Sequence, residues 1–249
     1  ARRCPETPLH VQTGHVSNVW GIRLPVERIT ALCHAYNVPV CIDCAQSAGV
    51  LPISMKEYNF DCICAPGHKG LYGPMGTGLL IVRDGSRINT IIEGGTGTAS
   101  ESLEQPAEIP ERFESGTINV PGIIGLRAGI SFVRRRTVHR IYEHESALVC
   151  RLYDRLKASQ KVELYMPRPQ SPYFAPLLSF NLPGKDSEDV AASLNKQGFA
   201  VRAGLHCAPR AHAFCGTLEH GAVRVCPSVF TTSEQMNAFA QAVMRIAAK

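Results

Sequence analysis

The stretch VPVCIDCAQSAGVLPISMKEYNFDCICAPGHKG, residues 38–70, decides the fold. It holds two apolar runs of strand length, residues 38–43 and 60–66, joined by a connector in which we expect a helix. Strand, helix and strand in this order are typical of a parallel sheet, whose strands are buried on both faces and therefore continuously apolar. Ligands bind beyond the carboxyl ends of such strands, where Asp43 and Lys69 lie.

The rest of the chain continues this α/β pattern. We expect a first part, residues 1–125, and a second domain, residues 126–249, in which strands and helices alternate again. Thr231 precedes Glu234 by three residues and is expected to cap the last helix. The other expected elements are helices within residues 24–38, 121–159 and 186–197, strands at residues 78–82, 177–184, 199–204 and 222–228, and a long loop over residues 87–116.

Composition limits the classes of function. With 249 residues, 45% hydrophobic and 19% charged, the chain can bury a sizeable core. Apolar runs stay below the roughly 18 residues that span a bilayer, so no membrane anchor is expected. The formal net charge of +5 is spread along the chain, which does not favour nucleic acid as a partner. Ten cysteines without the spacing of a disulfide scaffold fit a reducing cytoplasm.

Lys69 follows a glycine and a histidine directly after the second apolar run. Taken alone it is an ordinary solvated lysine, and with Asp43 it forms either a structural ion pair or a working pair. A lysine partly removed from water loses proton affinity, and its amine can then form a Schiff base with an aldehyde such as pyridoxal phosphate. That cofactor needs an acid against its ring nitrogen, for which Asp43 is placed, and Gln46 could reach the same site. The backbone of GGTGTAS, residues 94–100, could bind its phosphate.

The third group is RAGLHCAPRAHAFC, residues 202–215. Cys207 follows His206 and lies five residues after Arg202, an electropositive setting that favours thiolate. Arg224, on the next expected strand, could grip a carboxylate together with Arg202. Two other interpretations are a buried, inert Cys207 and a metal site with His212 and Cys215. Because Cys-x4-His-x2-Cys is not a usual zinc spacing, no metal is expected.

Six stretches together carry a resemblance to the class V aminotransferase family of pyridoxal phosphate enzymes, and in particular to its cysteine desulfurase branch. The short loop around Cys207 resembles the group II desulfurases. The resemblance implies fold-type I, with an incomplete large domain built on a mainly parallel sheet and a smaller C-terminal α/β domain. In family order, the stretches are HVSNVWG (15–21), CIDCAQSAG (41–49), GHKGLYGPMGTG (67–78), GGTGTASESLEQP (94–106), FESGTINVPGIIGL (113–126) and RAGLHCA (202–208).

The resemblance also implies roles for single residues. Lys69 would bind the cofactor covalently, Cys207 would be the nucleophile, and Thr96 would reach the phosphate in the partner subunit of a homodimer. The expected reaction converts L-cysteine to L-alanine with a persulfide on Cys207, which an acceptor protein takes for iron–sulfur cluster assembly or thiolation. The remaining roles are Asp43 at the pyridine nitrogen, Gln46 at the ring hydroxyl, His68 holding the cofactor, Asn18 near the hydroxyl and the substrate carboxylate, and Arg202 and Arg224 at that carboxylate.

Two features depart from the family pattern. Pro66 stands where a serine or threonine usually binds phosphate, and it has neither a hydroxyl nor an N–H. Family members also have a long segment before HVSN with a further phosphate loop and a histidine stacked on the cofactor ring, so we expect an N-terminally truncated desulfurase. The alternatives are a selenocysteine lyase, another class V lyase or aminotransferase, and an inactive fragment that acts as a scaffold.

Overall fold

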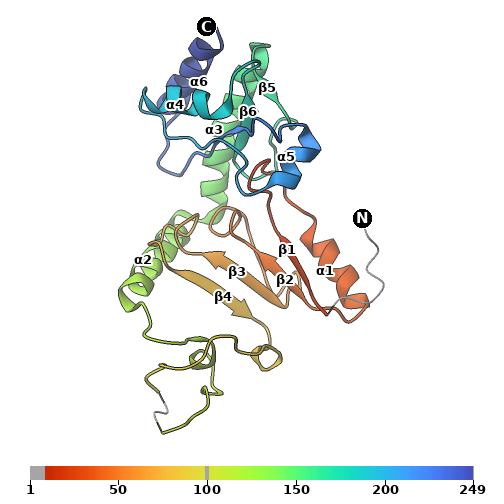
Figure 1. The fold of residues 1–249 in the computed structure, drawn as a ribbon, viewed down its shortest axis with the longest axis vertical. Coiled ribbons are helices and arrows are strands. Elements are labelled where there is room, and N and C mark those ends of the chain that lie inside the picture. Colours follow the sequence, from red (N-terminus) through yellow and green to blue (C-terminus); the bar gives the residue numbers. More distant parts are fainter. Residues whose placement is uncertain (1–8, 99–100, 249) are drawn as a thin grey trace. The chain divides into compact units, whose positions relative to one another are not determined.

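The computed structural model describes residues 9–98 and 101–248, which form two compact units (Figure 1). The first unit contains the described residues up to 13 together with residues 26–45 and 54–135. The second contains residues 14–25, 46–53 and those from 136 onward. The domain boundary expected at residue 125 stays a prediction, since these units reflect compactness alone.

The first unit is built on a four-stranded sheet in the order β1-β2-β3-β4 (Figure 1). Strands β2 and β3 are parallel, with Ile42 opposite Ile63, whereas β4 runs antiparallel to β3. Helix α1 packs against β2, and Val40 and Ile42 are buried, as the continuous apolar run predicts. The bounds are β1 Val11–Gly14, α1 Val26–Ala35, β2 Val40–Asp43, β3 Cys62–Pro66 and β4 Gly78–Val82.

The connector between β2 and β3 is not the helix that the sequence predicts. Its first part forms consecutive turns, in which the Ser47 carbonyl accepts hydrogen bonds from the amides of Val50 (3.0 Å) and Leu51 (2.8 Å). Pro52 disfavours helical backbone at Leu51, so the single turn does not continue. Gln46, in the first part of this connector, therefore lies in a turn and not in the expected helix.

The described residues within 83–119 form a loop that includes the one expected over residues 87–116, and they contain two short 3-10 helices, η1 Gly85–Arg87 and η2 Glu111–Phe113. The helical stretch after it is two helices, α2 Val120–Arg136 and α3 Val138–Ala158. They divide at Thr137, whose φ of 69° is not helical and whose hydroxyl accepts from the Arg140 amide. This hydroxyl caps the start of α3.

The second unit packs helices on a three-stranded antiparallel sheet in the order β5-β6-β7. Its core centres on Phe180, which is fully buried and meets Phe239 edge to face at 6.4 Å between ring centres. Among the described residues, no helix is long and apolar enough to cross a membrane. The bounds are β5 Glu163–Leu164, β6 Leu178–Asn181, α4 Ser187–Asn195, α5 Pro209–Cys215, β7 Val223–Val225 and α6 Ser233–Ala247.

Two local predictions in this unit are wrong. Residues 199–204 form no strand and make a single bridge, between Arg202 and Arg224. Helix α6 is capped by Thr232, which forms a reciprocal capping box with Gln235. The hydroxyl of Thr231 instead accepts from the Ser228 amide at 3.0 Å, which fixes the preceding turn.

Candidate functional site

Asp43 and Lys69 lie at the same edge of the first unit's sheet. Asp43 is the last residue of β2 and pairs in register with Cys64 of the parallel strand β3. Lys69 follows the end of β3 by three residues. Because parallel strands end on the same side, the carboxylate and the amine share one edge, as the sequence predicts. Asp43 is half-buried, and its Oδ1 accepts from the Ala45 amide at 2.8 Å.

The turn that carries Lys69 is closed by its own backbone. The Gly67 amide donates to Thr77 O, and the Gly73 amide donates back to Gly67 O, each at 2.8 Å. The Tyr72 amide donates to Lys69 O at 2.9 Å. The side chains of His68 and Lys69 are exposed. A hydrogen-bonded turn thus presents the amine at the sheet edge.

Helix α2 supports this turn from behind. A Cβ added to Gly129 would lie 2.3 Å from Leu71 O, so the helix backbone approaches the turn closely only because glycine stands there. Three residues after Gly129 on α2, the ring of Phe132 meets the ring of Tyr72 edge to face, with 5.4 Å between ring centres. The packing of α2 therefore fixes the position of the Lys69 turn.

Three thiols, Cys41, Cys62 and Cys64, lie on the sheet face that also bears Asp43. Burial raises the pKa of Cys41 and of Cys64 to about 11, and it raises the pKa of Cys62 as well. These cysteines are therefore neutral thiols at pH 7, which makes them poor nucleophiles. They also add no negative charge beside Asp43.

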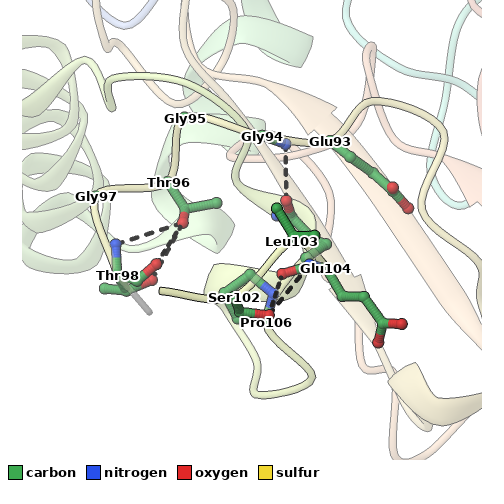
Figure 2. Close-up of a pocket in the computed structure, with 11 residues that line it drawn as sticks. Glu93, Gly94, Gly95, Thr96, Gly97, Thr98, Ser102, Leu103, Glu104 and Pro106 are labelled. Carbon is green, nitrogen blue, oxygen red and sulfur yellow. Dashed lines mark hydrogen bonds between the residues drawn. The ribbon is translucent and has the colours of Figure 1, made fainter. Parts of the chain in front are cut away.

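Thr96 lies in a glycine-rich hollow of about 440 Å³ within the long loop (Figure 2). Its hydroxyl is within hydrogen-bonding distance of Thr98 O (3.1 Å) and Thr98 Oγ1 (3.3 Å), and the Gly94 amide donates to Gln105 Oε1 at 2.9 Å. Residues 99 and 100 of the predicted phosphate stretch lie outside the described residues. The hollow is lined by residues 93–98 and 102–106.

In the second unit, four of the predicted residues meet around one turn. The Asn18 amide group donates to His206 O at 2.7 Å, and Arg224 Nη1 donates to Asn18 O at 2.7 Å. The backbones of Arg202 and Arg224 exchange hydrogen bonds of 3.2 and 2.7 Å. Cys207 follows in this turn as an exposed, free thiol.

The two arginines are held differently. Arg202 is exposed, whereas Arg224 is half-buried, and its Nε has no hydrogen-bond partner among the described residues. Gln46, also in this unit, is half-buried next to Ser47, whose hydroxyl lies 2.9 Å from His15 Nδ1. Asn18, Gln46, Arg202, Arg224 and Cys207 thus belong to the second unit, and Asp43, His68, Lys69 and Thr96 belong to the first.

Sequence reasoning missed the contact between His206 and His212. The two rings stack at 5.9 Å with an interplanar angle of 11°, and both are buried. Spacing alone gives no signal for this pair, because the left-handed turn that brings the rings together is not visible in the residue order. Over the described residues, no group of histidine, cysteine and acidic side chains could hold a metal ion.

Comparison with known proteins agrees with this arrangement. The family described as aminotransferase class V matches residues 5–239. The chain belongs to this class V aminotransferase family. A probable cysteine desulfurase of Mycolicibacterium paratuberculosis is 36% identical over 98% of this chain, and one of Methanothermobacter thermautotrophicus is 33% identical over 97%. The chain spans 35% and 61% of the lengths of these two class V relatives.

Solved structures place the chain in the same fold. The apo cysteine desulfurase of Thermococcus onnurineus NA1 matches with a TM-score of 0.90 at 34% identity, covering 96% of this chain and 60% of that one. The S-sulfonic acid form of cysteine desulfurase CsdA from Escherichia coli matches with a TM-score of 0.84 at 27% identity, covering 95% and 58%. The class V chain thus has the fold-type I α/β architecture of cysteine desulfurases, as the sequence predicts.

Proposed function

We propose that this chain carries the lysine and cysteine machinery of a pyridoxal-phosphate-dependent cysteine desulfurase that converts L-cysteine to L-alanine. The observation that carries the proposal is the placement of Asp43 and Lys69 at the ends of neighbouring parallel strands. An exposed cysteine in a turn flanked by two arginines adds the sulfur-accepting group. The family and the desulfurase relatives support the same reaction.

The residues present suit the cofactor. Asp43 offers a carboxylate to a protonated ring nitrogen, Lys69 offers an exposed primary amine to the aldehyde, and His68 and Gln46 would add contacts to the ring. Pro66 ends β3 opposite Gly78 and offers no phosphate donor, so neighbouring backbone amides would have to serve. Pyridoxal phosphate, when bound, supplies an electron sink that acidifies the substrate Cα.

The chain's own residues then have separate tasks. Arg202, whose guanidinium is exposed, would bind the substrate carboxylate, and Arg224 and Asn18 would complete that site. The Lys69 amine would move the proton at the substrate Cα. The Cys207 thiolate would attack the substrate sulfur, forming the S–S bond as the C–S bond breaks, so that L-cysteine and a thiol yield L-alanine and a persulfide.

Thr96 and its glycine-rich hollow would serve the phosphate of a second subunit in a homodimer. Backbone amides and the hydroxyls of Thr96, Thr98 and Ser102 line the hollow and are donors of the kind that phosphate needs. Glu93 and Glu104 line it as well, so these donors would have to outweigh two carboxylates. We further propose a cytoplasmic enzyme whose persulfide passes to an acceptor protein for iron–sulfur cluster assembly or thiolation.

The test follows sulfur from ³⁵S-labelled L-cysteine to a mapped peptide of the chain, supplied with pyridoxal phosphate. We expect alanine formation and label on Cys207, with both lost in Cys207→Ala. Cys226→Ala is the matched control, because Cys226 is also exposed, and it should retain both signals. Full turnover by Cys207→Ala would contradict the role of Cys207, and a chain that never forms alanine would support the scaffold alternative.

A further inference from the structure

The turn that bears Cys207 contains two destabilising features. His206 and Cys207 both have left-handed backbone, with φ values of 52° and 58°, a conformation that is unfavourable for residues other than glycine. His206 is also buried, with 7% of its surface exposed, and the hydrogen bond between its ring and the Arg202 backbone offsets only part of the cost of burying an imidazole. Such costs persist where the surroundings impose them, and they concentrate at functional sites.

The ring of His206 is held by helix α5. It stacks on His212 almost in parallel, and His212 is fully buried. His212 is itself fixed, because its Nδ1 lies 2.8 Å from Thr217 Oγ1 and its ring lies 5.4 Å from the ring of Trp20. The stack therefore connects the residue before Cys207 to the interior of the second unit.

The backbone of the turn is held on both sides of Cys207. His206 O accepts from the Asn18 side chain, and the Ala208 amide donates to Leu205 O at 2.8 Å. Behind the turn, Gly204 touches Gly221 so closely that a Cβ on Gly221 would lie 2.5 Å from Gly204 Cα. Displacing either contact would move the turn.

The ring of His206 is uncharged at neutral pH. Burial, reinforced by Arg224, His212 and Arg202, lowers the pKa of His206 to about 4. A neutral imidazole can remain beside the guanidinium groups of Arg202 and Arg224 without repelling them, which a lysine or arginine at this position could not do. The same ring can stack, which an aliphatic side chain cannot do.

We propose that His206 is a positioning residue, whose buried ring, stacked on His212, holds residues 204–208 in the left-handed turn that sets the direction of the Cys207 thiol. This inference rests on the proposed role of Cys207 as the nucleophile. His206 itself does not exchange a proton with the thiol. It acts through the backbone that the two residues share.

The first experiment compares His206→Leu, which removes the aromatic ring, with His206→Phe, which keeps a stacking ring without nitrogens. Hydrogen exchange is measured on the peptide that contains the Ala208 amide, and kcat and KM for L-cysteine are measured with pyridoxal phosphate. Exchange should be about fivefold faster in His206→Leu, which corresponds to a stack worth about 1 kcal/mol, and within about threefold of wild type in His206→Phe. In His206→Leu, kcat should fall about tenfold while KM stays within about twofold.

Equal exchange in wild type and His206→Leu would overturn the inference, as would a His206→Phe protein that behaves like His206→Leu. A rise in KM at constant kcat would also overturn it, because that result assigns His206 to substrate binding. If the wild-type chain forms no alanine, the proposed function fails, and the exchange rates still decide whether His206 holds the turn.

A second pair of variants covers the case in which His206→Leu does not fold. Gly221→Ala places a methyl group against Gly204, whereas Gly184→Ala has a similar positive φ, of 74° against 60°, with open space around it. Gly221→Ala should accelerate exchange at Ala208, and Gly184→Ala should leave it unchanged. Equal exchange in the two alanine variants would show that the turn is not held by this contact.

Discussion

Replacing His206 with glutamine should remove a pH-dependent part of the stability of the second unit. Glutamine has a similar volume and does not titrate. Burial, Arg224, His212 and Arg202 lower the pKa of His206 to about 4, whereas an unfolded histidine has a pKa of about 6.5. Between these values the unfolded chain binds more protons than the folded chain, so stability falls as the pH drops from 6.5 toward 4.

The size of the effect follows from the two pKa values. Across the whole range between the two pKa values, the free energy of unfolding changes by about 3 kcal/mol, and about 2 kcal/mol of this change falls between pH 7 and pH 5. His212 also has a lowered pKa, caused by burial. Because His212 is one of the groups that lower the pKa of His206, the difference between the two proteins measures His206 together with its interaction with His212.

Urea unfolding at pH 7 and pH 5, followed by tryptophan fluorescence, measures this difference. Trp20 is the single tryptophan, is buried in the second unit and lies against His212, so it reports on this region directly. On acidification from pH 7 to pH 5, the free energy of unfolding should fall by about 2 kcal/mol more in wild type than in His206→Gln. His220→Gln, at an exposed histidine, controls for the loss of an imidazole. Equal losses in wild type and His206→Gln would show that His206 does not titrate with a lowered pKa in the folded chain.

Two further predictions concern the first unit. Burial raises the pKa of Asp61, but the hydrogen bonds from His34 and the Val40 amide, with the charges of His34 and Arg83, outweigh it and hold the pKa below its usual value. The stabilisation that Asp61 provides is present above the pKa of the unfolded chain and is lost as the pH falls through the lower pKa of the folded chain. Acid unfolding followed by circular dichroism should therefore be less steep in Asp61→Asn than in wild type. An unchanged slope would contradict a stabilising interaction between Asp61 and His34. Gly129→Ala should destabilise, since overpacking against Leu71 O costs about 1–3 kcal/mol and the helix gain is about 1 kcal/mol. Ala128→Gly, at an exposed position of the same helix, measures the difference in helix propensity between alanine and glycine alone. A Gly129→Ala protein more stable than wild type would exclude the close contact with Leu71 O.

Local pattern was enough to predict the strands that position Asp43 and Lys69. Continuous apolar runs specify buried strands, and the observed β2 and β3 lie within the predicted ranges. The same reasoning failed between them, because the preference of residues 45–51 for turns depends on Pro52 and on a carbonyl that accepts two amides. It also failed at Thr231, since two adjacent threonines both precede a suitable partner by three residues and only packing selects Thr232.

The residues around Cys207 are brought together by contacts between positions far apart in the sequence. Asn18 bonds to His206, 188 residues later, and no periodicity in the sequence could indicate this contact. Cys207 and the two arginines were predicted from residue type and family order. The left-handed conformation of His206 and Cys207 was not, because non-glycine residues rarely adopt it without tertiary support.

Borohydride reduction of the chain mixed with pyridoxal phosphate, followed by peptide mapping, tests most directly whether Lys69 is the cofactor lysine. We expect a pyridoxyl label on the peptide bearing Lys69, absent in Lys69→Ala and retained in Lys56→Ala, a variant at an exposed lysine. A label on a different lysine, or equal labelling of wild type and Lys69→Ala, would contradict this expectation.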